Sequence, residues 1–161
     1  VTHEARDADA LGHHRHPQRL ELAAAVYDIG LVNLPTEFLR DIGKLRDAGL
    51  ALYQTYPVIG HDIIKKIAFH WPIAEIILQH RECYDGSGFP LKIQGKDILI
   101  EARILAVANA IEYMTSLRSY RDALTIEQAL KEIAEQSGAR FDPGVVDACL
   151  RVFREKGFIF N

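Results

Sequence analysis

The pattern of apolar and polar residues along this chain is mostly helical, and no segment shows the strict alternation that is typical of a β-strand. The helix over residues 99–116 is almost wholly apolar, so we expect it at the centre of the molecule. The fold class that we predict is all-α, a helical bundle. Helical spacing, with Pro, Thr or Asp at several starts and Gly at several ends, predicts helices over residues 17–30, 36–42, 46–55, 57–70, 72–83, 99–116, 125–138 and 142–157.

One stretch interrupts the helical pattern for longer than an ordinary connection does. Residues 84–98, YDGSGFPLKIQGKDI, contain three glycines, one proline and an Asp-Gly pair, all of which form turns readily. Long loops inside compact domains often carry function. We therefore expect a functional loop in this stretch.

Composition and charge narrow the class of protein. The 161 residues suffice for one compact domain, and a net charge of −3 gives no broad basic surface for nucleic acid or an anionic membrane. Only Cys83 and Cys149 are present, so we expect a reducing cytoplasm and no disulfide framework. No apolar run reaches the roughly 18 residues of a membrane span. The chain begins without Met, and its start reads like the tail of a helix. We expect a single domain over 1–161 that is the C-terminal part of a longer protein and lacks its first helix.

Three motifs carry a family resemblance over nearly the whole chain. QHRECYDGSGFP (79–90), EARILAVANAIEYMTSLRSYRDALT (101–125) and GARFDPGVV (138–146) resemble the HD-GYP family in order and in spacing. This family is a branch of the HD superfamily, and its active members are bacterial metal-dependent phosphodiesterases of cyclic di-GMP. The resemblance implies an HD-like helical bundle with one long GYP-type loop, in the bacterial cytoplasm.

The resemblance also implies where metal ligands would lie, and this chain has lost most of them. Of six ligand positions, only Asp28 and His80 keep a residue that the family uses. A phenol with a pKa of about 10 is a poor ligand at neutral pH, an arginine repels a cation, and an asparagine carries no charge. We therefore expect no catalysis and no metal, or at most a metal on Asp28 and His80. The six vestigial positions are Tyr27, Asp28, Tyr56, His80, Arg81 and Asn109.

The visible His-Asp pair falls outside these positions. His61 and Asp62, in HDIIKK (61–66), occupy variable places after the glycine of YPVIGHDII. We expect them on the surface of a helix, as a solvated pair beside Lys65 and Lys66.

The replacements at the vestigial site are mutually compatible. We predict that the guanidinium of Arg81 takes the place of a cation and pairs with a buried Asp28. In this hypothesis the two tyrosine hydroxyls, with Asn109, complete a hydrogen-bonded polar core.

Two further features of the family are kept here. In the family, two basic residues at RxxR spacing contact the phosphates of the dinucleotide, and they match Arg118 and Arg121. The alternative is a pair of exposed arginines that bond to neighbouring acids or carbonyls. The family's DGxGYP loop is implicated in binding GGDEF-domain proteins, and here Phe89 replaces its tyrosine. The loop residues that match are Asp85, Gly86, Gly88, Phe89 and Pro90.

The sequence thus favours a degenerate, inactive HD-GYP domain in cyclic di-GMP signalling. It would bind GGDEF-domain or other signalling proteins and also the dinucleotide, with a homodimer as a further option. One alternative is an active phosphodiesterase with two divalent ions, such as iron or manganese, on Asp28, His80, Glu82 and an upstream histidine. Another is a purely structural or dimerisation domain, which needs neither Arg118 nor Arg121.

Overall fold

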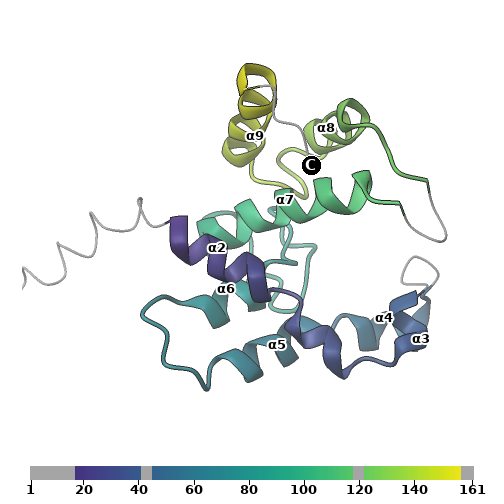
Figure 1. Cartoon of the computed structure of the whole chain (residues 1–161), viewed down its shortest axis with the longest axis vertical. Coiled ribbons are helices and arrows are strands. Elements are labelled where there is room, and N and C mark those ends of the chain that lie inside the picture. Colours follow the sequence, from purple (N-terminus) through teal and green to yellow (C-terminus); the bar gives the residue numbers. More distant parts are fainter. Residues whose placement is uncertain (1–16, 41–44, 118–121, 157–161) are drawn as a thin grey trace, which may run out of the picture.

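The structure is a computed structural model that describes residues 17–40, 45–117 and 122–156 (Figure 1). These ranges contain helices and no β-sheet, which confirms the all-α prediction. The elements are α2 (Pro17–Val26), η1 (Ile29–Asn33), α3 (Thr36–Arg40), α4 (Asp47–Tyr53), α5 (Tyr56–Ile64), α6 (Ile73–Gln79), η3 (Gly95–Asp97), α7 (Ile100–Thr115), α8 (Ile126–Glu135) and α9 (Pro143–Lys156).

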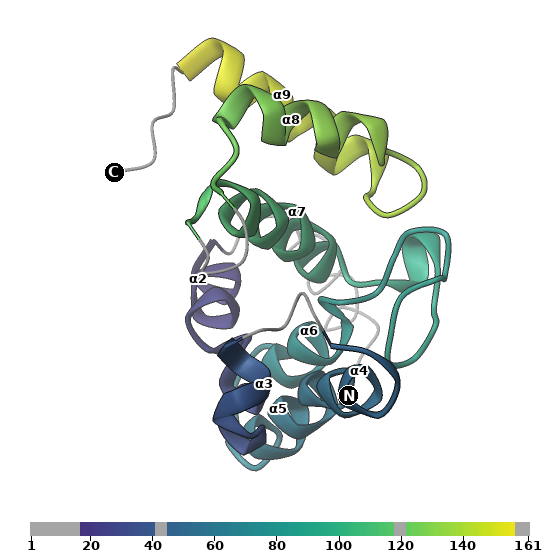
Figure 2. The same ribbon diagram turned by 90° about the vertical axis from the view of Figure 1, so that its right-hand side faces the viewer.

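Helix α7 lies at the centre and separates two groups of helices (Figure 2). Ala102 and Leu105 on one face of α7 join a buried apolar cluster with α2, α5 and α6. Val107 and Ile111 on another face join a second cluster with α8 and α9. The nearly all-apolar sequence of α7 is explained by this burial on two sides. At 16 residues it is the longest helix in the described ranges, and no helix there has the length and apolar character to cross a membrane.

Two ion pairs attach neighbouring segments of the chain to α7. Arg19 of α2 pairs with Glu101, and Arg103 pairs with Asp142 just before α9. All four side chains are largely buried, so loss of one partner would leave an uncompensated charge. The Asp142 carboxylate also accepts from the backbone N–H groups of Gly144 and Val145, at 2.7 and 3.2 Å, which confirms its predicted N-cap role.

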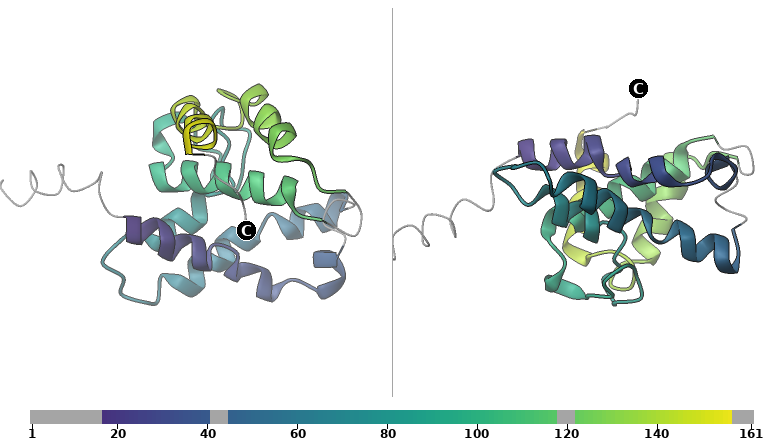
Figure 3. Two further views of the ribbon diagram at one scale, coloured as in Figure 1. Left: turned by 45° about the horizontal axis from the view of Figure 1, so that its top comes forward. Right: turned by 90° about the horizontal axis from the view of Figure 1, so that it is seen from below.

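The predicted helix over 57–70 is too long. Helix α5 ends at Ile64, and the chain continues through an irregular stretch to Pro72. Ile67 is 52% exposed, so a continued helix would have buried no apolar face there. Pro72 further disfavours helical backbone at the residue before it. Helices α3 and α4 lie toward the same end of the molecule as the C-terminal end of α7 in both views of Figure 3.

The packing of the core predicts that truncation of two isoleucines lowers the free energy of unfolding by very different amounts. Ile76→Ala removes a side chain that is 0% exposed, so we expect a loss of about 2–5 kcal/mol in the free energy of unfolding. Ile67→Ala is the matched control, because its side chain is largely in solvent and we expect little change. Urea denaturation followed by circular dichroism measures both, and equal losses would contradict this description of the core.

Candidate functional site

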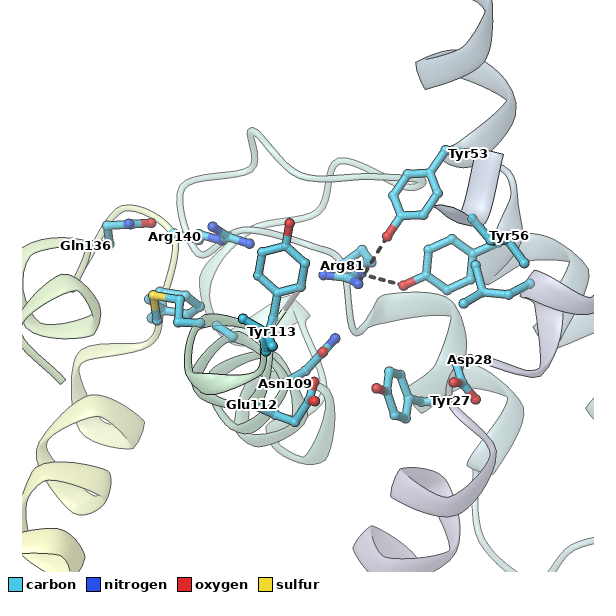
Figure 4. A pocket seen from close by; sticks show the side chains of 16 residues that line it. Tyr27, Asp28, Tyr53, Tyr56, Arg81, Asn109, Glu112, Tyr113, Gln136 and Arg140 are labelled. Carbon is cyan, nitrogen blue, oxygen red and sulfur yellow. Dashed lines mark hydrogen bonds between the residues drawn. The ribbon is translucent and has the colours of Figure 1, made fainter. Parts of the chain in front are cut away.

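A cavity of about 620 Å³ opens between the two groups of helices (Figure 4). Its walls come from the end of α2, the α4–α5 turn, the end of α6, the C-terminal half of α7 and the α8–α9 connection. Five of the six vestigial positions line it, namely Tyr27, Asp28, Tyr56, Arg81 and Asn109. The sixth, His80, lies behind Tyr56 and is 1% exposed. The sequence therefore predicted positions that the fold brings together.

A directed chain of hydrogen bonds runs through this wall. The Nδ1 atom of His80 lies 2.6 Å from the carbonyl oxygen of Ile77, which can only accept, so Nδ1 carries the proton. The Nε2 atom is then an acceptor, and the hydroxyl of Tyr56 donates to it at 2.7 Å. The same Tyr56 oxygen accepts from Nε–H of Arg81. Both ring nitrogens of His80 are thereby occupied.

Burial keeps the hydrogen-bonded groups of this wall neutral, except for the guanidinium of Arg81. Desolvation, followed by the nearby charge of Arg81, lowers the pKa of His80 to about 3. Desolvation also raises the pKa of Tyr56 well above its usual value, although Arg81 acts in the opposite direction. At neutral pH the imidazole is uncharged and the phenol keeps its proton.

The predicted pair between Arg81 and Asp28 is wrong. Asp28 is exposed, and no ion pair joins it to Arg81 in the part of the chain that the structure describes. Arg81 instead donates through Nη2 to the hydroxyl of Tyr53 at 3.2 Å, in addition to its bond to Tyr56. The physical reason is desolvation, because a carboxylate left in water avoids the cost of burial that the predicted pair would impose.

The predicted polar core is formed only in part. Tyr56 belongs to it, but the side-chain amide nitrogen of Asn109 is buried without a hydrogen-bond partner. Asn109 is 8% exposed and lines the cavity from α7. A buried donor of this kind is unfavourable unless a ligand or water satisfies it.

The donor set of this cavity does not fit two divalent metal ions. Within the described residues, no three or more His, Cys, Asp or Glu side chains lie together in a way that would hold a metal. The one histidine at the site has its free lone pair taken by Tyr56, and the adjacent Arg81 is a fixed cation. Glu82 does not line the cavity, so the alternative ligand set of Asp28, His80 and Glu82 does not converge.

Glu82 instead shapes the long loop that follows α6. Its Oε1 accepts from the backbone N–H groups of Leu91 and Lys92, at 2.6 and 3.2 Å. A Cβ atom on Gly88 would meet the backbone nitrogen of Cys83 at 2.2 Å, so only glycine fits this close approach. Gly86 has a φ of +84°, which also favours glycine. The loop motif is therefore explained by backbone geometry.

The visible His-Asp pair lies on the surface of α5, as predicted. Asp62 is 53% exposed in its side chain and bonds to Lys65 at 2.6 Å and to His61 at 3.2 Å. Lys65 lowers the pKa of Asp62, with His61 as the next cause. Neither His61 nor Asp62 lines the cavity.

Tyr53, Tyr113 and Arg140 are among the cavity residues that the sequence reasoning missed, although the first two carried a signal. Tyr53 precedes Tyr56 by three residues, and their rings lie 5.1 Å apart. Tyr113 follows Asn109 by four residues on α7, and this spacing places both on one helix face. Arg140 reaches the cavity from the connection before α9, and no local pattern indicated it. The predicted phosphate contacts Arg118 and Arg121 lie outside the described residues.

Comparison with known proteins agrees with this architecture. A family profile described as HD domain matches residues 8–145. The chain belongs to the HD-domain family. It is 38% identical over 134 residues to the cyclic di-GMP phosphodiesterase response regulator RpfG of Xanthomonas campestris, covering 82% of this chain and 35% of that protein. It is 35% identical over 135 residues to the 3'3'-cGAMP-specific phosphodiesterase 2 of Vibrio cholerae, covering 83% of this chain and 26% of that protein.

A solved structure shows the same fold. An HDG"Y"P protein from Bdellovibrio bacteriovorus superposes with a TM-score of 0.69 at 22% identity, over 85% of this chain and 44% of that one. This HD-domain chain thus has the fold that its motifs predicted, with the HD-GYP branch as its relatives. It spans between about a quarter and less than half of the length of these proteins.

The neutral His80 predicts a specific dependence of stability on pH. An unfolded chain takes up a proton on this histidine below a pH of about 6.5, whereas the folded chain resists protonation down to a pH of about 3. Stability is therefore lost as pH falls through this window, by at most about 1.4 kcal/mol per pH unit from this group. Urea unfolding at pH 7 and pH 5 should show a smaller loss in His80→Gln than in the unaltered chain. His70→Gln, at an exposed histidine, is the control. An equal pH dependence in the unaltered chain and His80→Gln would show that His80 is protonated normally.

Proposed function

We propose that this HD domain is hydrolytically silent and acts by binding in cyclic dinucleotide signalling. The observation that carries the proposal is the Tyr56 hydroxyl, which occupies the only lone pair that His80 could offer to a metal. A metal-bound hydroxide near neutral pH is the usual nucleophile of such enzymes, and it requires an open coordination site. Here the phenol of Tyr56 and the guanidinium of Arg81 take the place of an open coordination site.

The relatives support the class of ligand. They are named as phosphodiesterases of cyclic di-GMP and of 3'3'-cGAMP, both of which are cyclic purine dinucleotides. The cavity of this chain lies where the vestigial positions converge, and it is large enough for a ligand of nucleotide size. We infer that a cyclic dinucleotide is bound here without being cleaved.

The test is a hydrolysis assay combined with a metal measurement. The chain, purified without chelator, is incubated with cyclic di-GMP or 3'3'-cGAMP and with Mn²⁺ or Fe²⁺, and products are separated by chromatography. We expect no linear dinucleotide or mononucleotide, and well under one metal ion per chain by elemental mass spectrometry. The RpfG protein serves as the positive control. Turnover that disappears in both His80→Ala and Asp28→Ala would overturn the proposal.

The loop after α6 is the surface that we propose for a partner protein, namely a GGDEF-domain protein. Leu91 is a large apolar residue that projects from this loop into solvent, and Asp85 and Ser87 beside it are also exposed. Glu82 holds the backbone of the loop, so the surface is rigid and costs little entropy on binding.

The partner proposal predicts a selective loss of affinity. Leu91→Asp should weaken binding of a purified GGDEF domain from the same organism by about tenfold or more, because an exposed apolar contact is replaced by a charge. Ile67→Asp, at an exposed isoleucine on another part of the molecule, should bind as the unaltered chain does. Biolayer interferometry measures the affinities. Equal affinity of Leu91→Asp and the unaltered chain would exclude this face of the loop.

A further inference from the structure

Arg81 has donors that no group in the described part of the chain satisfies. Its Nε and Nη2 atoms bond to Tyr56 and Tyr53, but Nη1 has no hydrogen-bond partner and no carboxylate there forms an ion pair with it. The side chain is only partly exposed and lines the cavity. A half-buried guanidinium with open donors is a binding group for an anion, since its fork matches phosphate and carboxylate oxygens.

The two tyrosines hold Arg81 in position. Hydrogen bonds on one edge fix the plane of the guanidinium, and its central carbon lies 5.7 Å from the centre of the Tyr56 ring. In Figure 4 Arg81 lies between these tyrosines on one side and Asn109 and Tyr113 of α7 on the other. Its unpaired edge is therefore directed away from the tyrosines that bond to it, and no side-chain ordering is needed when an anion arrives.

A second observation points to a ligand in the same space. The amide nitrogen of Asn109, on a side chain that is more than nine-tenths buried, lacks a hydrogen-bond partner in the cavity wall. An acceptor bound near Arg81 would satisfy this donor as well. Arg140 lines the same cavity from the α8–α9 connection, but its side chain is exposed, so water screens its charge.

The carboxylates of the cavity lie at its exposed edge. Asp28 and Glu112 both line the cavity, but both are exposed, and the Oε1 atom of Glu112 accepts from the Ser116 hydroxyl at 2.6 Å. Water screens exposed charges far more than half-buried ones. The half-buried charge at this site is the guanidinium.

Aromatic rings complete the site. Four of the five tyrosines in the described residues line the cavity, namely Tyr27, Tyr53, Tyr56 and Tyr113. Tyrosine rings next to an arginine suit a planar base joined to a phosphate, because the base stacks while the guanidinium binds the phosphate. This combination favours a nucleotide over an isolated inorganic anion, and the ligands in the relatives' names make the base a purine.

We propose that Arg81 is the phosphate-binding cation of this cavity and replaces the metal ions in that role. The inference deepens the proposed function and rests on it. A purine nucleotide phosphodiester binds with its phosphate on Arg81 and Asn109, and no metal ion takes part. Its base lies against the partly exposed rings of Tyr27, Tyr53 and Tyr113. Binding is therefore insensitive to chelators, unlike recognition through bound cations.

Isothermal titration calorimetry of the full chain in excess EDTA tests this directly. The ligands are cyclic di-GMP, GMP and inorganic phosphate, and the variants are Arg81→Gln, Asn109→Asp and the control Arg151→Gln. We expect cyclic di-GMP to bind at least about tenfold more tightly than inorganic phosphate, and Arg81→Gln to lose at least about tenfold in affinity. Arg151 is exposed on α9 and lines no part of the cavity, so Arg151→Gln should stay within about twofold.

Asn109→Asp keeps the inference testable if Arg81→Gln unfolds. This change keeps the shape of the side chain and replaces a donor by a carboxylate that repels a phosphate, so affinity should again fall about tenfold or more. Melting temperatures of all variants identify any that fail to fold. Binding that requires Mn²⁺, or undiminished affinity in folded Arg81→Gln or in Asn109→Asp, would overturn the inference. So would inorganic phosphate binding as tightly as the nucleotides.

The two proposals fail in different ways. Hydrolysis of cyclic di-GMP would refute the silent domain itself. Absence of hydrolysis together with undiminished binding by Arg81→Gln would refute only the role of Arg81.

Discussion

The hydroxyl of Tyr56 is the group on which the arrangement of the cavity depends. It accepts from Arg81 and donates to His80, so it joins the start of α5 to the end of α6. Its position is set by a close backbone approach between η1 and α5. A Cβ atom on Gly30 would meet the carbonyl oxygen of Tyr56 at 1.9 Å, so only glycine permits this approach. The same contact brings the residues before Gly30, Tyr27 and Asp28, to the wall of the cavity.

This arrangement makes the charge of the site more positive. Compared with the ligand pattern that the family resemblance implies, Asn109 removes a carboxylate and Arg81 adds a guanidinium. Both changes make the cavity more positive, which offsets part of the charge that metal ions would supply. Neutral phenols rather than carboxylates satisfy Arg81, and they leave its charge available. Burial keeps His80 neutral, so no second cation is created beside it.

Local sequence patterns predicted the parts of the structure that depend on neighbours along the chain. The starts of α2, α8 and α9 follow from Pro17, Thr125 and Asp142, because caps act over one helical turn. The pairing of Arg81 could not be predicted in this way. Whether Asp28 is buried depends on how far η1 projects from the bundle, which is a tertiary property. Arg140 was missed for the same reason, since it lies far along the chain from Tyr56 and Arg81.

The residues that this chain retains in and around the GYP-type motif are those that fix the backbone conformation of the loop. Gly88 permits a close approach, and the Glu82 carboxylate binds the N–H groups of Leu91 and Lys92. The loop also pairs with the connection before α9, because Tyr84 donates to the carbonyl oxygen of Arg140 at 3.1 Å.

The positions that have changed are mainly those at which the family resemblance implies a metal ligand. A loop that is held by hydrogen bonds keeps its shape when a metal site is lost, so the two can change independently. The cavity and the loop nevertheless share a wall, since the carbonyl oxygen of Arg81 accepts from Phe89 at 3.2 Å. A ligand on the Arg81 side chain would therefore contact the same residue whose carbonyl oxygen supports the loop. Coupling between the two would need a loop with two discrete arrangements, and the tight packing around Gly88 opposes a second one. Ligand and partner are thus expected to bind side by side, with the domain as a rigid support for both.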